Sequence, residues 1–159
     1  MRPNRTREDD MRASLTLLLL LAGAAAATAA DGNFDKTIPV PRDSDARLEW
    51  KYQGCSVESL TLRNYPDRED IEEARRKDPG DKSWLWWEFN VANRSDQKCR
   101  ISLSVQVLDR KGNVVKSSDR SDSVSPGELD DDIRVSTLMK TVDIADAAKV
   151  RLHAQISFR

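Results

Sequence analysis

The amino-acid sequence predicts an all-β protein, an antiparallel β-sandwich of six or seven strands with one short surface helix inserted near residues 67–77. Three observations predict it. From residue 47 onward apolar and polar residues alternate, which is typical of strands buried on one face only. Turn residues separate the alternating runs. No crossover helices lie between the strands, as parallel strands would require, so the strands are expected to pair antiparallel.

Each strand is identified by its own pattern. In residues 47–53 the apolar side chains fall on every second position, and Gly54 is expected to kink or bulge the chain beyond them. Residues 99–109 are the clearest strand, and Gly112 then predicts a tight hairpin. The expected strands are residues 47–53, the stretch around Leu60 and Leu62, 84–92, 99–109, a short piece at Val114 and Val115, the stretch near Ile133 and Val135, and 150–158.

The inserted helix is predicted from its ends. Asp67 can cap its first turn, acidic residues follow at the positive end, and basic residues precede Pro79 at the negative end. Its apolar side is thin, mainly Ile71 and Ala74, so it is expected on the surface. One or two further helical turns are expected at residues 143–149.

Residues 11–30, MRASLTLLLLLAGAAAATAA, have a basic start, an apolar stretch and then small residues, which is the pattern of a secretory signal peptide. Residues 1–30 are therefore assigned to a signal peptide, and the acidic residues before Met11 favour Met11 as the true start. An uncleaved anchor is less favoured, because a bilayer span needs about 20 apolar residues. The mature protein is expected to be periplasmic or secreted, without membrane insertion, with a flexible lead-in at residues 31–46 and a single domain at residues 47–159.

The chain has two cysteines, Cys55 and Cys99, and both follow the expected leader. An even pair in an exported protein is most simply a disulfide. Their spacing suits neither a zinc site nor a CxxC redox motif.

The charge and motif content predict no enzyme and no cofactor. Basic and acidic residues nearly balance, with a formal net charge of −1, and the basic residues form no stripe, so no nucleic-acid partner is expected. No motif for a nucleophilic serine, a phosphate loop or a zinc protease is present. The single histidine, His153, is expected to face solvent from its strand.

An acidic run follows the expected turn at Pro126. Carboxylates close together in a loop are ligands that Ca²⁺ accepts, although the spacing is not that of an EF-hand. A charged edge strand that discourages pairing between molecules is the favoured alternative. The weak calcium candidates are Glu128, Asp130, Asp131 and Asp132.

Four short motifs follow one another in residues 89–128. They are Val91, Asn93 and Ser95 at the end of one strand, Leu108 and Asp109 at the end of the next, Gly112, Val114 and Val115 in a hairpin, and Pro126, Gly127 and Glu128 in a turn. In this order they resemble the small immunoglobulin-like domains of bacterial envelope proteins, of the FxLYD-like kind, without the tyrosine of that motif. The resemblance implies an immunoglobulin-like fold, an extracytoplasmic location and a non-catalytic role.

The stretch SWLWWEFN, residues 83–90, contains three of the four tryptophans. Because strand side chains alternate between faces, Trp87 is expected in the core, and Trp84 and Trp86 on the opposite face. In the favoured explanation, the inserted helix folds back and covers the outer pair with its apolar side. In the other, the two indoles are open and bind a partner.

These observations predict a non-catalytic interaction or structural module of the bacterial cell envelope, whose partner is an unknown envelope protein. The alternative is a carbohydrate-binding module that stacks a glycan on Trp84 and Trp86.

Overall fold

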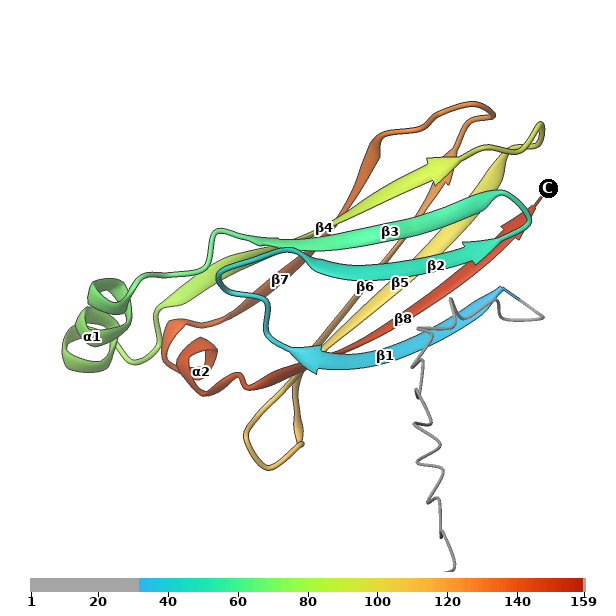
Figure 1. Cartoon of the computed structure of the whole chain (residues 1–159). Coiled ribbons are helices and arrows are strands. Elements are labelled where there is room, and N and C mark those ends of the chain that lie inside the picture. The colour runs from blue at the N-terminus through green and yellow to red at the C-terminus, as the bar shows by residue number, and fades with distance from the viewer. Residues whose placement is uncertain (1–31, 159) are drawn as a thin grey trace, which may run out of the picture.

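Two four-stranded antiparallel sheets lie face to face in the computed structural model, which describes residues 32–158 (Figure 1). The strand orders are β1-β8-β5-β6 in one sheet and β2-β3-β4-β7 in the other. The predicted all-β antiparallel sandwich is therefore confirmed, while the expected signal peptide at residues 1–30 lies outside the described residues. In chain order the elements are β1 (Asn33–Pro39), β2 (Ala46–Tyr52), β3 (Cys55–Arg63), α1 (Arg68–Lys77), β4 (Lys82–Asn93), β5 (Cys99–Leu108), β6 (Val114–Val124), β7 (Asp131–Lys140), α2 (Thr141–Asp146) and β8 (Lys149–Phe158).

The core lies between the inner faces of the two sheets. In β5 every second side chain from Cys99 to Val107 is buried, as the alternation predicts, and β8 shows the same pattern from Val150 to Ile156. Trp87 is the largest of the fully buried side chains. Burial of one large apolar side chain contributes about 1.5–3 kcal/mol, so this alternation is the main source of stability in the sandwich.

The expectation of a flexible lead-in at residues 31–46 is wrong for residues 33–39, which form β1. This strand pairs with β8 along its whole length, from Asn33 opposite Gln155 to Pro39 opposite Lys149. Phe34 is buried, and its ring stacks on Trp50 with 5.7 Å between ring centroids. The apolar signal in this strand is weak because Phe34 is its one buried residue, and an edge strand also tolerates proline.

The short strand expected around Val114 and Val115 is the start of an eleven-residue strand, β6. Because β1 was not among the expected strands, the described residues contain eight strands where six or seven were predicted. Alternation is absent in β6 because this edge strand carries polar side chains on both faces and has Val124 as its one buried residue. Arg120, for example, pairs with Leu103, whose side chain is buried. Charged side chains on the inward face of an edge strand discourage pairing with another molecule.

The predicted helix at residues 67–77 is confirmed as α1. Asp67 caps it by accepting a hydrogen bond from the Asp70 backbone N at 2.8 Å, and Asp70 accepts one from the Asp67 backbone N. α1 lies against α2 at one end of the sandwich, where both helices stand beyond the strand ends (Figure 1). Within residues 32–158, neither helix is long and apolar enough to cross a membrane.

The predicted disulfide between Cys55 and Cys99 is present, and it joins β3 of one sheet to β5 of the other. Gly54 makes the turn between β2 and β3, with φ of 87°, and is not a kink within one strand. The bulge in this hairpin lies instead between Arg47 and Trp50 of β2.

Candidate functional site

β4 separates the three clustered tryptophans, as alternation predicts. Its inner face buries Leu85, Trp87 and Phe89, and its outer face carries Trp84 and Trp86. Trp84 is 48% exposed, while Trp86 is half-buried. The question of function therefore concerns the outer face of the β2-β3-β4-β7 sheet.

The expected cover over these two indoles is not formed. α1 packs against α2, and its buried residue is Ala74. The physical reason is that the apolar side of α1 has another partner: Ile71 shares a crevice with Tyr65 and with Ala145 of α2. With its apolar side used there, α1 leaves Trp84 open to solvent.

A charged network orders the side chains around Trp86. Glu88, whose side chain is only 16% exposed, accepts hydrogen bonds from Arg134 Nη2 at 2.7 Å and from Arg63 Nε at 3.1 Å. Arg134 lies with its guanidinium carbon 4.7 Å from the centroid of the Trp86 ring, a cation–π contact. Leu138 of β7 pairs with Trp84 and is partly exposed. We call Arg63, Trp84, Trp86, Glu88, Arg134 and Leu138 the tryptophan face.

The register of β4 with its neighbours β3 and β7 brings these side chains together. Glu88 of β4 pairs with Arg134 of β7, and the neighbouring pair on the β3 side is Arg63 with Trp86. Burial raises the pKa of Glu88, but the hydrogen bonds and charges of Arg63 and Arg134 outweigh burial, so the pKa lies below its ordinary value. Glu88 is therefore ionised at neutral pH and holds both arginines in place. Neither arginine was found from the sequence, because strand pairing is not visible there.

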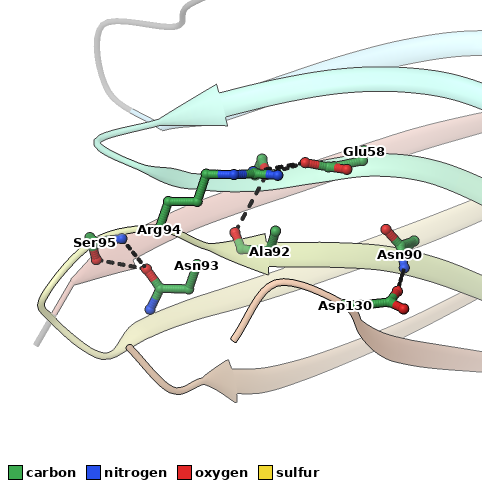
Figure 2. A network of polar contacts seen from close by, with 8 residues as sticks. Glu58, Asn90, Ala92, Asn93, Arg94, Ser95 and Asp130 are labelled. Atoms are coloured by element: carbon green, nitrogen blue, oxygen red, sulfur yellow. Dashed lines mark hydrogen bonds and ion pairs between the residues drawn. The ribbon is translucent and has the colours of Figure 1, made fainter. Parts of the chain in front are cut away.

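The other end of this outer face is polar (Figure 2). Arg94 donates to Glu58 Oε1 at 2.9 Å, and Asn90 donates to Asp130 at 2.6 Å. The Arg94 hydrogen bond lowers the pKa of Glu58. A shallow hollow of about 300 Å³ lies beside them, lined by Glu58, Asn90 and charged residues of β2 that include Arg47.

Asn93 has a structural role in the turn after β4. It is fully buried, and its Nδ2 donates to the backbone oxygens of Gln97 and Val124. Its Oδ1 accepts from the backbone N and the hydroxyl of Ser95 (Figure 2). The Asn93 and Ser95 positions of the family resemblance therefore shape a turn and leave no polar atom free for a ligand.

The structure does not gather the calcium candidates into one site. Glu128 accepts from the Ser125 backbone N, and Asp130 is bonded to Asn90. Within residues 32–158, no group of three or more His, Cys, Asp or Glu side chains is placed to hold a metal ion. The candidates were Glu128, Asp130, Asp131 and Asp132.

His153 faces outward from β8, as predicted. Its Nδ1 lies 3.0 Å from Asp35 Oδ1 of the neighbouring strand β1, and both side chains are substantially exposed. The pair lies on the sheet that does not carry the tryptophan face.

No family model and no curated protein matches this chain. Among solved structures, the enzymatically active domain of bacteriophage CBA120 tailspike protein 4 is similar over 79% of this chain, at 10% identity and a TM-score of 0.21. The match spans only 17% of that chain. So low a TM-score carries no argument about fold or activity.

Proposed function

We propose that this protein is an exported, non-catalytic interaction module of the bacterial cell envelope, and that the tryptophan face docks a partner protein. The observation that carries the proposal is an exposed tryptophan, Trp84, beside arginines already held in place by Glu88. Tryptophan and arginine are the residue types most often found at the energetic centre of protein interfaces. Side chains fixed before binding lose less conformational entropy when a partner docks.

The contact between Arg134 and Trp86 favours a protein over a glycan. A sugar ring stacks on an open aromatic face, and two adjacent indoles would provide a platform for it. Here the guanidinium of Arg134 lies over the Trp86 ring, so Trp84 is the more open indole of the pair. A mixed surface of one open indole, two arginines and Leu138 suits the varied side chains of a protein partner.

Export is supported by the disulfide. Cys55 and Cys99 are both fully buried and bonded, and disulfides persist mainly in oxidising compartments. The signal-peptide pattern of residues 11–30 and the resemblance to FxLYD-like envelope domains agree with the same location.

Photo-crosslinking tests the proposal. p-Benzoylphenylalanine is placed at position 136 of the full-length precursor in its native host, because Ser136 of β7 is exposed and pairs with Trp86, so both indoles stay in place. The control is position 155, an exposed site on β8. We expect a discrete protein adduct from position 136 and none from position 155. The adduct should weaken when Arg134→Ala removes the ordered arginine. Equal adducts at both positions, or none at 136, would contradict a docking face.

Tryptophan fluorescence distinguishes the carbohydrate alternative. A glycan that shifts the emission of the native protein, but not of the Trp84→Ala variant, would favour carbohydrate binding over protein docking. Trp84→Ala should itself change the free energy of unfolding by less than about 1 kcal/mol, because the indole is half exposed and surface substitutions cost little. A much larger loss would show that Trp84 is needed for folding.

A further inference from the structure

A crevice of about 410 Å³ opens at the helical end of the sandwich, between α1, α2 and the loop that follows β1. Its lining combines an aromatic ring and an aliphatic side chain with three arginines and one glutamate. The residues that matter for its chemistry are Arg42, Tyr65, Arg68, Ile71, Glu72 and Arg75. None of them belongs to the tryptophan face.

Arg42 is held in place at the wall of this crevice. Its guanidinium carbon lies 4.9 Å from the centroid of the Tyr65 ring, and its Nη2 donates to the Ala147 backbone oxygen at 2.7 Å. Tyr65 is fixed in turn, because its hydroxyl donates to the Ile144 backbone oxygen at 3.2 Å. Burial raises the pKa of Tyr65, so the hydroxyl keeps its proton. The remaining N–H groups of Arg42 are thus presented in a fixed orientation.

The charges along the crevice are unequal. Three arginines and one carboxylate line it, and the carboxylate, Glu72, is bonded to Arg68 at 2.8 Å. The guanidinium of Arg75 and the N–H groups of Arg42 that do not bond to Ala147 are left to bind a ligand. The opposite flank of α1 has a crevice of equal volume with the reverse character, because four acidic side chains and one lysine line it: Asp70, Glu73, Asp78, Asp81 and Lys77.

We propose that the basic crevice binds a small organic monocarboxylate with a flat apolar body, the carboxylate reaching Arg75 and Arg42 and the body lying on Ile71 beside Tyr65. Arginine forks match the geometry of a carboxylate. Inorganic phosphate has no apolar body to place on Ile71 and Tyr65, so the apolar part of the lining favours an organic acid over phosphate. The same chemistry is offered by a free aromatic acid and by the C-terminal residue of a peptide.

An NMR titration of the mature protein tests this with three small probes. Phenylacetate carries both the charge and the ring, acetate has only the charge, and phenylacetamide has only the ring. We expect phenylacetate to bind about tenfold or more tightly than either of the others, and to shift amide signals of α1 and α2. N-acetylphenylalanine then identifies the source: tighter binding than phenylacetate indicates a peptide terminus, and weaker binding a free acid, and each supports the shared chemistry.

Two neighbouring arginines provide matched variants. Arg75 lines the crevice, whereas Arg76 lies on the same last turn of α1 but faces a different, mostly acidic surface. Arg75→Gln should weaken phenylacetate binding about tenfold, the loss expected for one charge-assisted hydrogen bond. Arg76→Gln makes the same change of charge and should leave binding unchanged.

Three results would overturn the proposal. Equal effects of Arg75→Gln and Arg76→Gln would mean that binding reflects only the net charge of the helix. Equal affinities for acetate and phenylacetate would show that the apolar surface of the crevice does not contribute to binding. Inorganic phosphate binding more tightly than phenylacetate would show a different ligand class.

Discussion

Thr137→Val tests the hydrogen bond that anchors the largest core side chain. Trp87 and Thr137 are both fully buried, and the indole Nε1 of Trp87 donates to Thr137 Oγ1 at 3.0 Å. The threonine hydroxyl donates onward to Ser118 Oγ of β6 at 3.1 Å. This short chain of hydrogen bonds links β4 and β7 of one sheet to β6, the edge strand of the other.

Valine has nearly the shape of threonine, so the substitution leaves no cavity and removes only the hydroxyl, which accepts from Trp87 and donates to Ser118. A buried N–H without a partner costs about 1–3 kcal/mol. Ser118 is partly exposed and can bond to water instead, so it adds little. We expect a loss of about 2 kcal/mol, which lowers the guanidinium chloride midpoint by about 0.7 M for an m-value of about 3 kcal/mol/M.

A double-mutant cycle with Trp87→Phe isolates the bond, because phenylalanine has no N–H. In that background Thr137→Val should cost less than about 0.5 kcal/mol, which leaves most of the loss as coupling energy between the two residues. Thr137→Ser keeps the hydroxyl and should cost only about 1 kcal/mol for the lost methyl group. Equal costs of Thr137→Val with tryptophan and with phenylalanine at position 87 would refute this account.

Three further outcomes are expected. Replacing Cys55 and Cys99 together by alanine should lower the free energy of unfolding by about 4 kcal/mol in denaturant titrations, because the disulfide closes a loop across 44 residues; a loss below about 1 kcal/mol would contradict this. The lowered pKa of Glu88 stabilises the fold above the unfolded-state pKa of about 4.3 and ceases to do so as pH falls through the folded-state value. Unfolding midpoints measured between neutral and acid pH should therefore fall more for the native protein than for Glu88→Gln, and parallel curves would exclude this role. Gly32→Ala should destabilise more than Gly112→Ala in thermal melts: both glycines have positive φ, but a Cβ at Gly32 would meet the Ile156 oxygen at 2.3 Å, whereas nothing lies within 4 Å at Gly112, and equal melting temperatures would contradict the clash.

The elements that sequence reasoning found are those whose signals are local. The alternation in β5 and β4 predicted which side chains enter the core, because the period of a strand is the same wherever it lies. The ends of α1 were predicted from Asp67 and from the charges of its first and last turns, since caps act within a few residues. The disulfide was predicted from an even pair of cysteines after an expected export signal.

The edge strands β1 and β6 show where such signals are lost. A strand with a partner on one side only and little core contact has no need of alternating apolar residues, so Lys116 and Arg120 can lie within β6. The prediction that α1 covers Trp84 and Trp86 was also wrong, because an apolar side as thin as Ile71 and Ala74 does not specify which surface it will contact. The position of α2 decided that.

The same distinction between local signals and long-range contacts applies to the tryptophan face. Alternation was enough to separate Trp87, which is core, from Trp84 and Trp86, which face outward. The exposure of the outer indoles depends on which strands become neighbours and in what register. The same pairings bring Arg63 and Arg134 to Glu88. Those pairings join residues 25 and 46 positions apart in the chain. Contacts between residues so distant in sequence are set by the assembly of the whole sandwich, and no local pattern of residues specifies them.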